Sequence, residues 1–156
     1  AGHKLGCRIE DIRHGLRMTR SDQWPKLLAS FIEARRGRPF AWGENDCCLF
    51  AADWIREATG RDIACDYRGK YHSALSAARI LQNEGGVLGV FRKAAEREGM
   101  IVVTPSHAQR GDIVARDSED GPLLGVCIGA LGAFVSERGL RFVQVQGERD
   151  IVCWRF

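Results

Sequence analysis

Apolar residues recur at helical spacing through the first part of the chain. The spacing i, i+3, i+4, i+7, i+8 puts side chains on one face of a helix. This spacing is found at Trp24, Leu27, Leu28, Phe31 and Ile32. Ser21 and Asp22 are residues that cap helix N-termini, Pro25 suits a first turn, and Gly37 is a stop signal. A helix is therefore predicted from about residue 22 to residue 36.

Three more helices are predicted behind it. The second runs from Asp46 to Thr59 and ends at Gly60. The third covers about 73–83, before Gly85 and Gly86, and the fourth covers about 88–98 and ends at Gly99. The inward face of the second helix consists of Phe50, Ala51, Trp54, Ile55 and Ala58.

After residue 99 the apolar pattern changes to the period of two that is typical of strands. Clusters of Pro, Gly, Asp and Ser separate the segments 100–103, 112–115, 123–128, 133–135, 140–145 and 151–154. Because helices come first and strands second, we expect an α+β fold with an antiparallel sheet of about five strands.

Composition narrows the class of protein. The 156 residues suit one domain, assigned to 18–156, with 1–17 as an upstream or artificial extension because Met18 can be a start. A net charge of +3 with mixed signs does not favour nucleic-acid binding. No apolar run reaches the length of a membrane span, and no secretory signal opens the chain. We expect a protein made in the cytoplasm.

Six cysteines without a CxxC pair favour reduced thiols over a zinc site or a disulfide framework. The acidic residues Asp117, Glu119 and Asp120 lack the spacing of a calcium loop, so a polar hairpin loop is favoured there. We therefore expect no metal and no cofactor. The tryptophans are expected in the core or in cleft walls.

Cys47 stands out by its position. Asp46 is a good N-cap, which would put Cys47 in the first helical turn, beside unpaired N–H groups and the positive end of the helix dipole. A thiol ionises most easily there. Cys47 is therefore the candidate nucleophile, and Cys48, about 100° further round the helix, is expected to be a packing residue.

The surrounding stretch resembles a known family. Residues 39–43, Pro-Phe-Ala-Trp-Gly, followed by Asp46 and Cys47, resemble the turn and helix start of the NlpC-like cysteine peptidases, which are papain-fold peptidoglycan endopeptidases. Residues 111–114, Gly-Asp-Ile-Val, are similar to that family's first core strand, and 124–129 to its second. The insert with Thr-Gly-Arg-Asp at 59–62 and Arg-Gly-Lys-Tyr at 68–71 looks most like a branch from phage and prophage tail gene clusters.

The resemblance implies a papain-like NlpC-type fold and a cleft formed by Phe40, Trp42, Asp46, Cys47, Leu124 and Ser136. It also implies departures from the family. The base His is matched by Leu124, the tyrosine that helps to stabilise the oxyanion is matched by Phe40, and the residue that orients the base falls near Ser136. Of these functional positions, Cys47 alone is kept.

Four histidines remain as substitutes for the base. His107 precedes the first core strand and is expected at the end away from Leu124, whereas His72 is expected as a cap or a solvated residue. His3 and His14 lie in the extension, which could fold into the cleft.

Two functions stay open at this stage. One is a phage-tail-associated peptidoglycan endopeptidase, weakly active or inactive because its base is missing. The other is a non-catalytic tail-tip assembly or cell-wall-binding module. The expected partners are phage tail proteins or cell-wall peptide, and the expected location is the cytoplasm or the virion tail.

Overall fold

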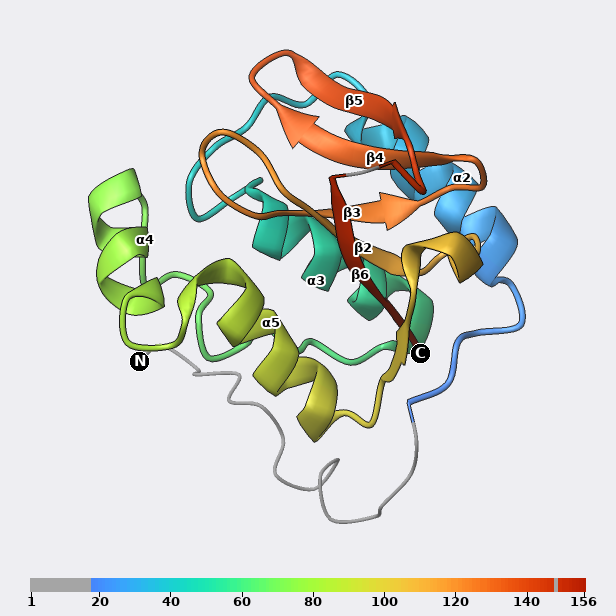
Figure 1. Ribbon diagram of the computed structural model, residues 1–156, viewed down its shortest axis with the longest axis horizontal. Helices are drawn as coiled ribbons and strands as arrows, with labels where there is room; N and C mark the ends of the chain where they lie inside the picture. The colour runs from blue at the N-terminus through green and yellow to red at the C-terminus, as the bar shows by residue number, and fades with distance from the viewer. Residues whose placement is uncertain (1–17, 148) are drawn as a thin grey trace, which may run out of the picture.

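The computed structural model describes residues 18–147 and 149–156, and they form an α+β fold (Figure 1). The extension 1–17, with His3, His14 and Cys7, lies outside the described residues. The helices are α2 (Trp24–Arg35), α3 (Cys47–Thr59), α4 (Ala74–Leu81), α5 (Gly86–Arg97) and the 3-10 turn η1 (Pro105–His107). The strands are β1 (Ile101–Val103), β2 (Ile113–Arg116), β3 (Leu123–Cys127), β4 (Leu131–Ser136), β5 (Gly139–Gln144) and β6 (Asp150–Arg155).

The strands form one antiparallel sheet of six, in the order β1-β6-β2-β3-β4-β5. The α+β class and antiparallel sheet predicted from the sequence are confirmed, with one strand more than the expected five or so. The last strand, β6, lies between β1 and β2. The C-terminal segment therefore pairs with β1, which follows the helices in sequence, and with β2 of the central hairpin. Between β3 and β4 the pairing covers only two positions, Val126↔Ala133 and Cys127↔Gly132.

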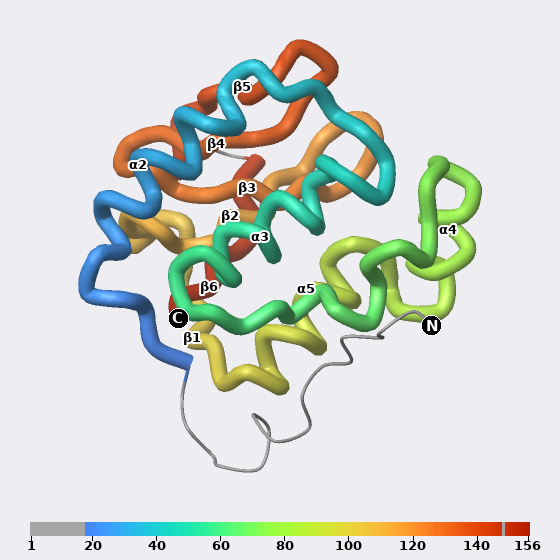
Figure 2. The backbone as a smooth tube through the Cα atoms, turned by 180° about the vertical axis from the view of Figure 1, so that it is seen from behind, coloured from blue at the N-terminus to red at the C-terminus, as the bar shows by residue number. Residues whose placement is uncertain are grey.

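Helix α3 is the centre of the core. It packs against β3 and β4 of the sheet and against α2, which lies beside it (Figure 2). Phe50, Trp54 and Ile55 are fully buried, and the indole N–H of Trp54 donates to the carbonyl of Gly111 at 2.9 Å. Trp154 is also buried, against Phe91 of α5. Phe50, Trp54 and Ile55 occur at the predicted inward positions of α3, and this core holds the helix on the sheet.

Alternation along the strands divides the sheet into two apolar faces. Ile113, Ala115, Leu124 and Val126 join the core beneath the helices. The residues between them face a smaller cluster on the other side, which contains Val103, Val114, Cys127, Phe134, Val145 and Cys153. The period of two therefore predicts which strand residues face α3.

The helix ends agree with the sequence in some places and not in others. Asp46 caps α3, and Gly60 ends it in the left-handed conformation, as predicted. Helix α2 is capped instead by Gln23, without a side-chain hydrogen bond, because the Ser21 hydroxyl accepts from the Gln23 N–H in the preceding turn. Gly86 begins α5, so it does not belong to the stop between the two helices.

A buried carboxylate ties the approach to α3 in place. Asp53, on α3, accepts from Arg35 of α2 at 2.8 Å and from Arg68 of the following loop at 2.7 Å. Arg35 also donates to the side-chain oxygen of Asn45, whose amide holds the carbonyls of residues 38 and 39. Three segments that are distant in sequence are thus fixed around the start of α3.

The cysteine expectation needs one correction. Cys65 is disulfide-bonded, so reduced thiols were the wrong prediction for this residue. The free cysteines among the described residues are Cys47, Cys48, Cys127 and Cys153. Within the same described ranges, no helix is both long and apolar enough to span a bilayer.

Candidate active site

The N-terminus of α3 is held by one carboxylate with three hydrogen bonds. Oδ1 of Asp46 accepts from the Leu49 N–H at 2.9 Å, which is the N-cap interaction. Oδ2 accepts from the Gly43 N–H at 3.0 Å and from the Tyr71 hydroxyl at 2.5 Å. Asp46 is itself buried. This arrangement puts Cys47 at the first helical position, as the sequence predicts.

The turn before α3 forms a wall beside Cys47. Phe40 and Trp42 pack edge to face, with ring centroids 4.8 Å apart, and Trp42 is 40% exposed. Gly43 has φ of +75°, and a Cβ there would collide with the backbone carbonyl of Tyr71. A side chain at position 43 would therefore push the turn away from the segment that carries Tyr71.

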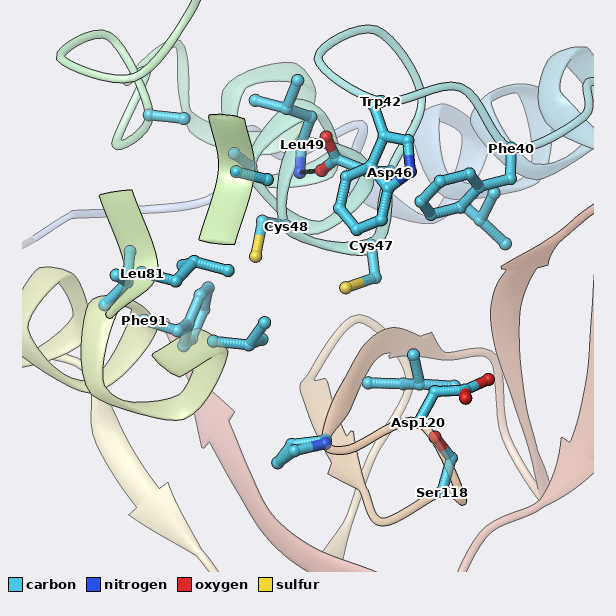
Figure 3. A pocket seen from close by; sticks show the side chains of 18 of the residues that line it. Phe40, Trp42, Asp46, Cys47, Cys48, Leu49, Leu81, Phe91, Ser118 and Asp120 are labelled. Atoms are coloured by element: carbon cyan, nitrogen blue, oxygen red, sulfur yellow. Dashed lines mark hydrogen bonds between the residues drawn. The ribbon is translucent and has the colours of Figure 1, made fainter. Parts of the chain in front are cut away.

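Cys47 opens into a cleft of about 920 Å³ that has two chemically different sides. The apolar side comes from the segment 63–64, α4 and α5, and includes Ile63, Ile80, Leu81, Val87, Val90 and Phe91. The polar side comes from the β2–β3 loop and the β4–β5 hairpin, and includes Ser118, Glu119, Asp120, Ser136, Glu137 and Arg141. Figure 3 shows Cys47 between Trp42 and the loop of Ser118 and Asp120, and Cys48 on the side of Leu81 and Phe91.

The two adjacent thiols differ in acidity. A hydrogen bond from the Cys48 thiol is the strongest influence that holds the pKa of Cys47 below its ordinary value, and backbone N–H groups of Leu124 and Cys48 add to it. Burial and the Asp46 carboxylate act in the opposite direction. The pKa of Cys48 is well above its ordinary value because its thiol is bonded to Cys47 and buried. Cys47 is therefore the thiol that ionises first.

Leu124, the position matched to the family's base, lies at the Cys47 sulfur through its backbone. The β3–β4 ladder ends at Val126, and the Leu124 N–H donates to Cys47 instead. The Leu124 side chain is fully buried in the core cluster beneath the helices. This position can stabilise a thiolate, but it cannot accept or supply a proton.

The histidines that the structure describes do not line the cleft. His107 is exposed in η1, with Nδ1 near the hydroxyls of Thr104 and Ser106. His72 is exposed just before α4, and its backbone N–H donates to Ser76. His72 is thus a solvated residue, one of the two alternatives expected for it.

The remaining predicted site residues have structural partners. The Ser136 hydroxyl donates to the Gly139 carbonyl at 2.6 Å and closes the β4–β5 turn, while its own carbonyl accepts from the Phe40 N–H at 2.9 Å. Asp117, Glu119 and Asp120 lie in the β2–β3 loop, as predicted. Across residues 18–147 and 149–156, no group of three or more His, Cys, Asp or Glu side chains is placed to hold a metal ion.

Tyr71 is the site residue that the sequence did not single out for this role. Burial, and then its hydrogen bond to Asp46, raise the pKa of its hydroxyl far above the ordinary value, so it stays protonated as a donor. The turn itself has Phe40 where the resembled family has a tyrosine. A phenol therefore lies at the site, but it comes from a segment 25 residues beyond Asp46.

The chain belongs to the family described as "Domain of unknown function (DUF6950)", whose model matches residues 19–156. The match covers all the elements described above, including the cleft and both sides of its lining. None of the curated proteins matches the chain.

Proposed function

We propose that this chain is a papain-like domain of the NlpC type, in which the cleft at Cys47 binds cell-wall peptide and cleaves amide bonds slowly or not at all. One observation carries the proposal. The Cys47 sulfur lies at the N-terminus of α3 and against the backbone of Leu124, the position matched to the base of the NlpC-like peptidases. The described lining of the cleft contains no imidazole.

The chemistry follows from what surrounds the sulfur. The lowered pKa of Cys47 makes its thiol easier to ionise than an ordinary cysteine, which favours the first half of a nucleophilic attack. An amide nitrogen must be protonated as it leaves, and a positioned acid usually contributes about 10²–10⁴-fold to such a step. Glu119 and Asp120 line the polar side of the cleft as exposed side chains, and the described lining contains no imidazole that could supply that proton.

Purified peptidoglycan sacculi test both parts of the proposal. We expect the protein and its Cys47→Ser variant to sediment equally with sacculi. We also expect the parent protein to release about as few soluble peptide fragments as the variant does. Failure to sediment would contradict the binding part. Rapid fragment release that Cys47→Ser abolishes would contradict the weak or absent catalysis, and the same assay with His3→Ala/His14→Ala would show whether the extension supplies a base.

Association with a phage tail is the second part of the proposed role, and it rests on the resemblance of the segment 59–71. In this role the domain acts as a tail-tip assembly module, with or without wall binding. The test is co-purification of the tagged chain with tail proteins expressed together with it. Absence of any tail protein from the purified sample would contradict this role and leave the peptide-binding result unaffected.

A further inference from the structure

The apolar side of the cleft extends away from Cys47, past Cys48. Leu81 and Val90 line it from two different helices, and Phe91 forms its floor. Helices α4 and α5 pack against each other, and Cys48 lies between Cys47 and this surface (Figure 3). A hydrocarbon group attached to a carbonyl at Cys47 would therefore pass Cys48 and lie between the two helices.

The missing acid restricts which acyl donors can react. An amine leaves an acyl group only when it is protonated, but a thiolate is a good leaving group by itself. A cysteine with a lowered pKa, in a cleft whose described lining contains no imidazole to protonate a leaving amine, is therefore better suited to exchange with thioesters than to cleaving amides.

We propose that Cys47 accepts an aliphatic acyl group from an acyl thioester and that the chain of this group binds the apolar side of the cleft. The occupant is a neutral hydrocarbon because the surface around Leu81, Val90 and Phe91 offers no charged partner, whereas charged residues gather on the opposite side, where the polar thiol would leave. This proposal uses the reactive thiol and does not depend on peptide binding.

The step is balanced without any further reagent. The Cys47 thiolate attacks the thioester carbonyl, a new carbon–sulfur bond forms, and the original carbon–sulfur bond breaks. The donor thiol leaves as a thiolate, so no proton, oxidant or reductant is consumed. Because the described cleft has no imidazole to activate water, the acylated Cys47 persists.

Octanoyl and acetyl thioesters of N-acetylcysteamine test the proposal on the full chain. Each methylene group that becomes buried is worth about fourfold in affinity. With rates normalised to those of free cysteine, we expect octanoylation of Cys47 to be at least about tenfold faster than acetylation. Intact mass and peptide mapping measure the adduct, which Cys47→Ser should lose.

Charged substitutions locate the chain-binding surface. Leu81→Asp and, separately, Val90→Asp should remove the octanoyl preference, and circular dichroism checks that each variant is folded. Leu75→Asp is the matched control, because Leu75 is on the same helix and 63% exposed outside the cleft lining. We expect it to behave like the parent chain.

Three outcomes would overturn the inference. They are equal normalised rates for the two thioesters, an octanoyl preference that survives both charged substitutions, and adducts that turn over as fast as they form. Iodoacetamide labelling of Cys47 in the same samples separates the causes. Normal labelling with no acyl preference would reject the hydrocarbon site, whereas poor labelling would reject the reactive thiol on which the proposed function also depends.

Discussion

Replacing Asp46 with alanine removes the group that joins three segments at the candidate site. Its carboxylate accepts from the N–H groups of Leu49 and Gly43 and from the Tyr71 hydroxyl. Loss of an N-cap costs about 1 kcal/mol. Each of the other two bonds goes to a buried charge and is worth about 1.5 kcal/mol. Asp46→Ala should therefore lower the free energy of unfolding by about 4 kcal/mol.

Urea unfolding at pH 7, followed by tryptophan fluorescence, measures this loss, and thermal unfolding should show a Tm lower by roughly 12 °C for a chain of this size. Tyr71→Phe removes one of the three bonds and should cost about 1.5 kcal/mol. Asp22→Ala is the control, because Asp22 is exposed and does not cap α2, and it should stay within about 0.5 kcal/mol. A loss below about 1.5 kcal/mol for Asp46→Ala would refute this account of how the site is held.

Three further substitutions test other parts of the site. Cys48→Ala removes the strongest influence that lowers the pKa of Cys47, so that pKa should rise and iodoacetamide labelling at pH 7 should slow; an unchanged rate would contradict the assigned cause. Gly43→Ala forces a side chain into a backbone carbonyl at a positive φ and should cost more than about 1 kcal/mol in urea unfolding, whereas Gly37→Ala, with open space around it, should not. Leu124→His restores an imidazole at the position matched to the base and should raise cleavage of peptide amides by about 10²-fold or more, at a cost of about 2–4 kcal/mol in stability measured by the same unfolding assay; a folded variant with no gain would contradict the role given to the missing base.

Much of the fold could be predicted because local signals agreed with the final packing. The periodicity of α3 identified its buried face, and Asp46 and Gly60 marked its ends. The start of α2 was less predictable, since Ser21 and Asp22 are both good caps and the preceding turn uses Ser21. The pairing of β6 with β1 and β2 joins residues that are 34 to 54 positions apart in the chain, and no local pattern indicates such a contact.

Part of the candidate site could likewise be predicted from the sequence, and part could not. The position of Cys47 followed from its own helix start, and the resemblance placed Leu124 near it. Tyr71 could not be found in this way, because its hydroxyl reaches Asp46 only after the loop beyond α3 has folded back. The disulfide at Cys65 was also missed, since no spacing of cysteines indicated it. Contacts made by the tertiary fold therefore supply the parts of the site that sequence patterns do not.

The pH dependence of Cys47 alkylation tests the central claim most directly, namely that Cys47 is an acidic thiol beside which the described part of the chain places no imidazole. The rate should follow a single ionisation with a pKa below that of an ordinary cysteine, and replacing each of the four histidines with alanine should leave this profile unchanged. A second ionisation that disappears with one of these histidines would contradict the claim, because it would reveal a base that reaches the sulfur.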